Sequence, residues 1–402
     1  MASSILTAVT RRRFLLASGT AAVAAASGTA LEWRHLTQRA AQTPRPSSAR
    51  VLVVVTLYGG NDGLNTVIPY TDPAYHAARG ALAYTSDEVL PLTDELALNP
   101  ALTGLATLFK RNQLAIVRGV DYPNPDFSHF RSMDIWQTAS PDEPINTGWI
   151  GRWLDATGDD PVRAVNLGAV LPPLAVGART AAAALPVGRS SPLPAVGADA
   201  FTAMAVGDPA DTAAQSRLRA SYRAERSVAG TFAKVVGPAA GGGNALAEQL
   251  DVVARCVRLG VPTRVYSTDL GGFDTHADEK GTQQAQLKLV DDALTTFLST
   301  MAADPYGQHV VVMVYSEFGR RVAANASGGT DHGSAGPVLV AGVPVRGGLY
   351  GEQPSLTDLA DGNLKAAVDF RAVYGELLHR VLGADPVQIL GSARPELGFI
   401  AT

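Results

Sequence analysis

Acidic and imidazole side chains gather in short segments at the ends of apolar runs of the chain. Four of these segments, residues 61–62, 121–129, 274–276 and 316–320, follow such runs, and a fifth, residues 328–334, precedes one. Three of the seven histidines, His129, His276 and His332, fall within them. Carboxylates and imidazoles are the usual oxygen and nitrogen ligands of divalent metal ions such as Zn²⁺ and Mn²⁺. The residue types therefore predict a metal site and metal-assisted chemistry.

The segments can act together only if the fold brings their strands side by side. Runs rich in β-branched residues predict strands at 50–57, 114–120, 263–267, 309–315 and 337–341. Helical patterns at 101–110, 244–259 and 283–301 alternate with them. This alternation predicts an α/β fold with a doubly wound, mostly parallel sheet. Ligands of such sheets bind beyond the carboxyl ends of the strands, where the predicted metal-binding segments would converge.

The chain divides into an N-terminal segment and one large domain. We expect residues 50–402 to form a single α/β domain. Within it, residues 155–243 are rich in Ala, Pro and Gly and offer few convincing strands, so we interpret them as a cap or insertion.

Residues 1–41 carry the pattern of a twin-arginine export signal. Arg11, Arg12 and Arg13 precede Phe14-Leu15 and a weakly apolar, Ala-rich stretch. An ordinary secretory signal or an uncleaved anchor is the alternative. The pattern predicts export to the periplasm or the extracellular space, and no later segment approaches the roughly 20 apolar residues that span a bilayer.

Charge and cysteine content narrow the function classes. The formal net charge is −4, and the balance after residue 41 is more acidic still. This surface argues against nucleic-acid binding, which needs basic patches. Cys256 is the only cysteine, so an intrachain disulfide is excluded, and its helical context predicts a small buried hydrophobic residue. The oligomeric state is left open by the sequence.

The predicted metal ligands are the acidic and imidazole residues of these segments. They are Asp62, Asp274, His276, Glu317, Asp331 and His332. Zn²⁺, Mn²⁺ and Ca²⁺ are all candidate ions. Each residue also has a structural interpretation: Asp62 suits a turn, and a buried Glu317 needs a cation or an arginine such as Arg320 or Arg321 beside it.

Three residues are candidates for the chemical step. Ser128 is the candidate nucleophile, although a serine before a helix start also suits an N-cap. His129 is a candidate for proton transfer, as is His276 if it is not a metal ligand. Arg320 is a candidate for neutralising charge that develops on an ester group, with Arg131 and Arg321 as alternatives.

Taken together, the motifs resemble one family, the secreted bacterial family of unknown function numbered 1501. The resemblance covers most of the chain after the signal and is carried by residues 59–65, 128–130, 273–276, 316–320, 329–333 and 369–371. That family is grouped with the alkaline phosphatase and sulfatase superfamily. The resemblance implies hydrolysis of phosphate or sulfate esters, of a small molecule or a polysaccharide, by a hydroxyl nucleophile and one or two metal ions.

The resemblance also implies roles for single residues. Asp62 resembles the ligand after the first strand, Asp274 and His276 a later ligand pair, and His332 the last histidine ligand. Ser128 falls where the nucleophile would lie, and Glu317 stands where an Asp-His pair is usual.

The chain departs from the superfamily pattern in two places, and these leave other functions open. Asp274 and His276 are two residues apart instead of four, and no histidine follows Glu317. Such departures favour a non-catalytic exported binding or assembly protein that keeps the fold and a structural ion. A carboxyl or carbohydrate esterase is a third candidate, although Ser128 lacks a Gly-x-Ser-x-Gly context. No Cys/Ser-x-Pro-x-Arg motif occurs, which excludes the formylglycine sulfatase mechanism.

Overall fold

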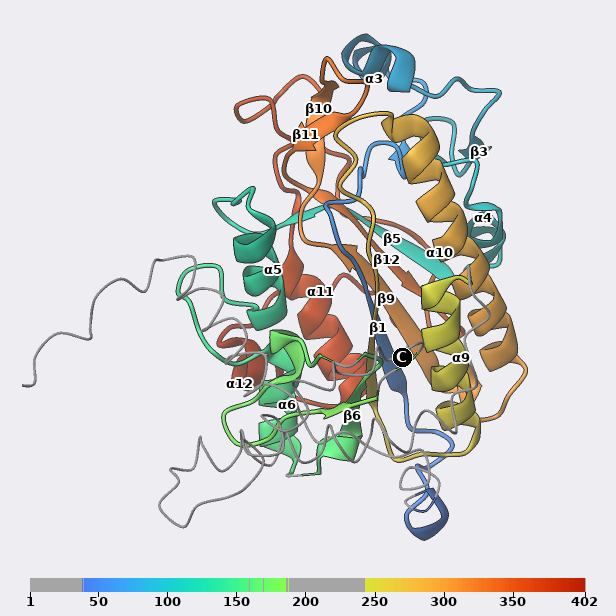
Figure 1. Cartoon of the computed structure of the whole chain (residues 1–402), viewed down its shortest axis with the longest axis vertical. Coiled ribbons are helices and arrows are strands. Elements are labelled where there is room, and N and C mark those ends of the chain that lie inside the picture. Colours follow the sequence, from blue (N-terminus) through green and yellow to red (C-terminus); the bar gives the residue numbers. More distant parts are fainter. Residues whose placement is uncertain are drawn as a thin grey trace, which may run out of the picture.

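A twisted sheet crosses the whole molecule (Figure 1). The computed structural model describes residues 38, 40–158, 160–168, 170–185, 187 and 243–401. Within these residues, nine strands form the main sheet, eight of them in the order β13-β5-β12-β9-β1-β8-β6-β7, with β14 pairing to β5. Neighbouring strands run parallel except for β12, which is antiparallel to both β5 and β9. The α/β, doubly wound, mostly parallel fold predicted from the sequence is confirmed.

The central strand β1 (Val51–Leu57) is fully buried along its length. It lies between two parallel neighbours, β8 and β9. A strand covered on both faces needs apolar side chains on both, which is why the sequence reads as a continuous run of β-branched residues. All five predicted strands are present in this sheet; the other four are β5 (Leu114–Asp121), β8 (Val265–Leu270), β9 (Val310–Ser316) and β12 (Gly336–Ala341).

Helices cover both faces of the sheet (Figure 1). One face packs against α4 (Thr103–Lys110), α9 (Ala245–Arg258) and α10 (Glu279–Ala302), all three of which the sequence predicts. The predicted burial of Cys256 in α9 is confirmed. The other face packs against α5 (His129–Thr138), α6 (Trp149–Thr157), α11 (Phe370–Glu376) and α12 (Pro386–Leu390).

Shorter elements complete the described part of the chain. β6 (Ala164–Asn166) and β7 (Ala183–Ala184) extend one edge of the main sheet, and β13 (Gly348–Tyr350) and β14 (Val368–Asp369) extend the other. A small sheet of β2 (Val67–Ile68), β3 (Leu90–Pro91) and β4 (Ala97–Leu98) lies near α3 (Pro73–Arg79). The hairpin β10 (Arg320–Ala324) and β11 (Thr330–His332) stands beyond the carboxyl ends of the central strands.

Two sequence predictions concern residues that are largely outside the described part. The export signal at 1–41 lies there except for residues 38, 40 and 41. Of the predicted cap at 155–243, the first part contributes β6 and β7 to the main sheet, whereas residues 188–242 lie outside the described residues. None of the described helices combines the length and the apolar character that crossing a membrane requires.

Candidate metal centre

Three ligand atoms form a close triangle beyond the ends of β8 and β9. Oδ1 of Asp274 lies 3.0 Å from Nε2 of His276 and 3.0 Å from Nε2 of His332. The two imidazole nitrogens are also 3.0 Å apart. Asp274 and His276 follow β8, and His332 ends β11, so the fold brings together groups 58 residues apart.

The backbone fixes which nitrogen of His332 faces this triangle. Its Nδ1 lies 2.8 Å from the carbonyl oxygen of Phe127 and donates to it. The Nε2 of the neutral ring therefore presents a lone pair to the carboxylate of Asp274. Two lone-pair atoms at 3.0 Å repel each other unless a proton or a cation lies between them. An imidazole held through its second nitrogen by a carbonyl is also the usual arrangement of a metal-binding histidine.

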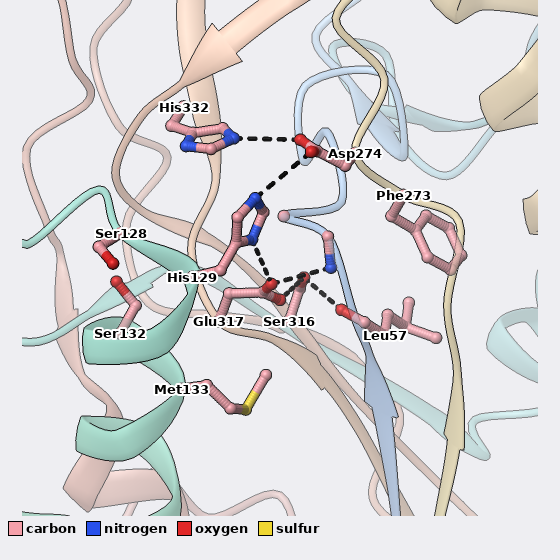
Figure 2. A network of polar contacts seen from close by, with 12 residues as sticks. Leu57, Ser128, His129, Ser132, Met133, Phe273, Asp274, Ser316, Glu317 and His332 are labelled. Carbon is pink, nitrogen blue, oxygen red and sulfur yellow. Dashed lines mark hydrogen bonds and ion pairs between the residues drawn. The ribbon is translucent and has the colours of Figure 1, made fainter. Parts of the chain in front are cut away.

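A fourth side chain, His129 at the start of α5, joins this group from the neighbouring helix. Its Nε2 lies 3.4 Å from Oδ2 of Asp274. One ligand atom from each of His129, Asp274 and His332 falls within 4.8 Å of the others. Figure 2 shows the two rings on the same side of the Asp274 carboxylate.

Glu317 holds the other nitrogen of His129 (Figure 2). Its Oε1 lies 2.9 Å from Nδ1 of His129 and accepts a 2.8 Å hydrogen bond from the backbone N–H of Gly59. Its Oε2 lies 2.9 Å from the hydroxyl of Ser316, which also contacts the carbonyl of Leu57 at 2.6 Å. Glu317 is buried, and its ionisable partner is His129, whereas the sequence had predicted a cation or an arginine such as Arg320 or Arg321. Glu317 therefore orients His129 instead of reaching the triangle itself.

Arg320 connects the loops that carry these groups. Its guanidinium is fully buried. It donates to the carbonyls of Gly59 and Gly60 after β1, and to those of Phe273 and Thr330. Its Nη2 also lies 2.9 Å from Oδ1 of Asp274. Because all three guanidinium nitrogens already donate to protein oxygens, Arg320 acts as a positioning residue. This geometry does not offer direct contact between Arg320 and an ester group.

The charge of Asp274 is well stabilised. Partial burial opposes its ionisation, but a hydrogen bond from His332, which requires a proton on Nε2 in place of the lone pair, and the hydrogen bond and charge of Arg320 outweigh this effect and lower the pKa of Asp274 to about 2. About half of its side chain is still exposed. The triangle therefore holds a carboxylate that is ionised across the physiological range and open to solvent on one side.

Asp62 does not lie with these residues, although the sequence predicted it as a ligand. It is fully buried, and both of its carboxylate oxygens are bound by the guanidinium of Arg79 on α3. Burial alone would raise the pKa of Asp62, but the charge and hydrogen bonds of Arg79 lower it. An arginine that occupies both oxygens leaves no lone pair directed at a shared cation, so Asp62 takes no part in the proposed centre.

A second buried carboxyl group, Glu279, lies beside this ion pair. Its Oε2 accepts a 2.6 Å hydrogen bond from the hydroxyl of Thr330. Burial and the charge of Asp62 raise the pKa of Glu279 to about 9, so it is protonated at neutral pH. Asp62, Arg79 and Glu279 together form a buried cluster without net charge.

The other predicted residues lie at the margin. Oδ1 of Asp331 is 3.6 Å from Nδ1 of His276, and its side chain is exposed. Ser128 occupies the N-cap position of α5 but makes no side-chain capping bond. Its hydroxyl lies beside Ser132, to one side of the histidine network in Figure 2.

The centre depends on close backbone approach at Gly59. This residue has φ +119°, and a Cβ there would lie 2.4 Å from the backbone nitrogen of Asp274. No rotamer change relieves a clash with backbone, so the loop bearing Asp274 would have to shift.

We expect Gly59→Ala to lower the free energy of unfolding by about 1–3 kcal/mol and to weaken metal binding. Gly271→Ala is the matched control, because it alters the same Asp274 loop where a Cβ meets no atom within 4 Å. Chemical denaturation and metal titration measure both. Equal behaviour of the two variants would contradict the role assigned to Gly59.

Comparison with known proteins supports the family assignment. The model of a family described as "Protein of unknown function (DUF1501)" matches residues 193–393, half of the chain. The chain belongs to this family. The resemblance inferred from the motifs is thereby confirmed, and none of the curated proteins matches the chain.

Several solved structures are distantly similar. One is a protein in the alkaline phosphatase superfamily from Vibrio parahaemolyticus, with 11% identity over 94% of this chain and 78% of that chain and a TM-score of 0.40. The lipoteichoic acid synthase LtaP from Listeria monocytogenes has 9% identity, coverages of 92% and 80%, and a TM-score of 0.39. A putative sulfatase from Bacteroides thetaiotaomicron has 10% identity, coverages of 88% and 73%, and a TM-score of 0.34.

Proposed function

We propose that this protein is an exported, metal-dependent hydrolase of phosphate or sulfate esters. The observation that carries the proposal is the triangle of Asp274, His276 and His332, in which three potential ligand atoms lie 3.0 Å apart. Atoms this close can share one ion, because bonds from Zn²⁺ to nitrogen and oxygen are about 2.0–2.2 Å long. The signal pattern of residues 1–41 supports export.

The donor set fits a divalent ion. It combines two imidazoles with one carboxylate, a combination found in catalytic zinc sites. A divalent ion bound there would supply Lewis acidity and lower the pKa of an attacking hydroxyl group. The exposed side of Asp274 leaves room for an ester beside the ligands.

We assign proton transfer to His129. Glu317 accepts from Nδ1, so the neutral ring presents Nε2 towards the triangle, 3.4 Å from Asp274. This resembles the pairing of a buried carboxylate with a histidine general base, in which the carboxylate fixes the tautomer of the ring and stabilises the imidazolium that forms. Ser128 lies to one side of this network, so its hydroxyl is not directed at the triangle, and we assign the attack to a water molecule at the exposed side of Asp274.

Replacing His129 separates its assigned role from that of a ligand. We expect His129→Gln to lower kcat by about 10²–10⁴-fold, the usual contribution of a general acid or base, with the metal content unchanged. Glu317→Gln should lower kcat less, because the amide oxygen can still accept from the ring while the carboxylate charge is lost. Rates on aryl phosphate and aryl sulfate, with metal analysis of each preparation, measure this.

His379→Gln is the matched control, because His379 also pairs with a glutamate, Glu396, at the surface. Loss of metal in His129→Gln would make His129 a ligand and overturn the assigned role. Bound metal without turnover of any ester by the unmodified protein would instead favour the non-catalytic binding or assembly function.

A further inference from the structure

A cavity of about 630 Å³ adjoins the proposed centre and has His129 and Glu317 in its wall. It lies between the sheet and α5, at the carboxyl ends of β1, β8 and β6. Figure 2 shows its Met133 one turn along α5 from His129, on the same side of the helix. The cavity therefore extends from His129, the proposed proton-transfer residue, along α5 and over the sheet.

Polar side chains at the carboxyl ends of the strands form the floor of this cavity, although the rest of that sheet face is apolar. Along β1, Leu52 and Val54 are core residues of this face, and alternation places Thr56 next on the same side. Thr56 is the register partner of Asp269 on β8. Both side chains line the cavity, together with Asn166 at the end of β6.

The opposite wall is apolar. Phe130 and Met133 contribute from α5, and residues 170–174 contribute a valine, two leucines and two prolines. Phe130 is 90% exposed and Val170 is 53% exposed, which is unusual for large apolar side chains. Both leave apolar surface open to solvent at this cavity. An apolar group entering here would remove that surface from water.

The charged groups that line the cavity are acidic. Apart from His129, they are Asp134, Asp269 and Glu317, and no lysine or arginine is present among the described residues of the lining. Asp134 pairs with Arg131, and Glu317 pairs with His129. Asp269 is half-buried, and its carboxylate makes no hydrogen bond or ion pair with any described residue.

We propose that this cavity binds the alcohol portion of the ester, and that Asp269 selects an alcohol bearing an alkylammonium group. The assignment of the ligand as part of an ester rests on the proposed function. Binding of an alkylammonium group in the cavity does not depend on hydrolysis. A cation would pair with the unpartnered carboxylate, and its methyl or methylene groups would contact Phe130, Met133 and the ring of Tyr58. Aromatic faces such as those of Tyr58 and Phe130, both in the lining, attract quaternary ammonium groups through cation–π interactions.

Asp269 would be stabilised by such a ligand. Burial raises the pKa of Asp269 because it disfavours the ionised form. A cation beside the carboxylate offsets the cost of burying its charge, whereas a neutral group of the same shape does not reduce that cost. Discrimination between cationic and neutral ligands of equal size is therefore the specific expectation.

The test compares ligands by isothermal titration calorimetry on the full chain. Choline and its neutral isostere 3,3-dimethyl-1-butanol differ in charge, and benzyltrimethylammonium adds apolar bulk. We expect choline to bind at least about tenfold more tightly than the isostere, the effect of one modest charge contact, and benzyltrimethylammonium to bind more tightly again.

Asp269→Asn should abolish the preference for choline over its isostere, and Asp292→Asn should keep it. Asp292 is a control of equal charge change, because it pairs with Lys288 on the exposed side of α10. Phe130→Ala, at an exposed position that folding does not depend on, should weaken benzyltrimethylammonium severalfold more than choline.

Equal binding of choline and the isostere by the unmodified protein, or an unchanged preference in Asp269→Asn, overturns the inference. Hydrolysis of aryl phosphate without any ammonium preference would contradict this inference but not the proposed function. Ammonium binding without hydrolysis of any phosphate or sulfate ester would contradict the proposed function but not this inference.

Discussion

Asp274→Asn is expected to remove bound metal and ester hydrolysis together. Asp274 Oδ1 is the corner of the triangle that touches both His276 and His332, and its negative charge is the largest attraction offered to a cation there. Outer-shell partners of metal ligands cost about 10–100-fold in affinity or activity when they are replaced. Loss of the carboxylate at the centre should therefore exceed about 100-fold in both.

The measurement pairs metal analysis with a rate assay. Chelation of the unmodified protein should abolish hydrolysis, and addition of Zn²⁺, Mn²⁺ or Ca²⁺ singly should show which ion restores it. Asp361→Asn is the control, since Asp361 is a nearly fully exposed aspartate whose carboxylate lies 3.9 Å from Arg321. Full metal content and full activity in Asp274→Asn would remove the proposed centre.

His332→Ala tests a second corner by a different route. It deletes an imidazole whose Nδ1 is anchored to the carbonyl of Phe127, the residue two before His129. We expect the same joint loss of metal and turnover. A loss of turnover with metal retained would instead place His332 among the substrate-binding groups.

Much of the sheet was predictable because a strand buried on both faces needs an unbroken apolar run. Val51–Leu57 and Val310–Ser316 are such runs, and the sequence places both correctly. β6 and β7 escaped prediction because strands of three and two residues leave no periodic pattern. The antiparallel direction of β12 also depends on pairing with β5 and β9, which no local pattern encodes.

The site was predictable in its residue types but not in its division of roles. The strand-end rule correctly brings Asp274, His276 and His332 together from two separate segments. It cannot tell that Glu317, at the end of β9, turns to His129. That choice depends on the position of α5 in space.

Asp62 shows the same limit most clearly. It follows the first strand and two glycines, as a ligand would, but a helix 11 residues further along supplies Arg79, which binds it first. Nothing in the spacing marks that arginine as its partner. Asp269 was missed for the same reason, because the polar residues Ser267, Thr268 and Asp269 at the end of β8 show no alternation that marks a cavity floor.

The ion pair of Asp62 and Arg79 gives the largest expected effect on stability. Both side chains are fully buried. Arg79 also donates to the carbonyls of Val322 at 2.7 Å and Arg321 at 3.0 Å, so it ties α3 to the β10–β11 hairpin that carries His332. Its replacement would leave a buried carboxylate uncompensated and two carbonyls unpaired.

We therefore expect Arg79→Leu to lower the free energy of unfolding by about 3–5 kcal/mol, the usual cost of removing one partner of a buried ion pair. Urea denaturation measures it, with the dependence on urea unchanged if unfolding stays two-state. Arg321→Leu is the matched control, because Arg321 is partly exposed and faces Asp361 only at 3.9 Å, so it should cost no more than about 1 kcal/mol.

The double variant Asp62→Asn with Arg79→Leu decides whether charge or packing is responsible. If the uncompensated carboxylate dominates, removing its charge should recover a large part of the loss. If the double variant is as unstable as Arg79→Leu alone, the carbonyls of the hairpin and the lost packing carry the cost. The Arg79→Leu variant should also bind metal more weakly, because the hairpin that presents His332 loses its anchor to α3, and a stable protein with unaltered metal affinity would refute this coupling.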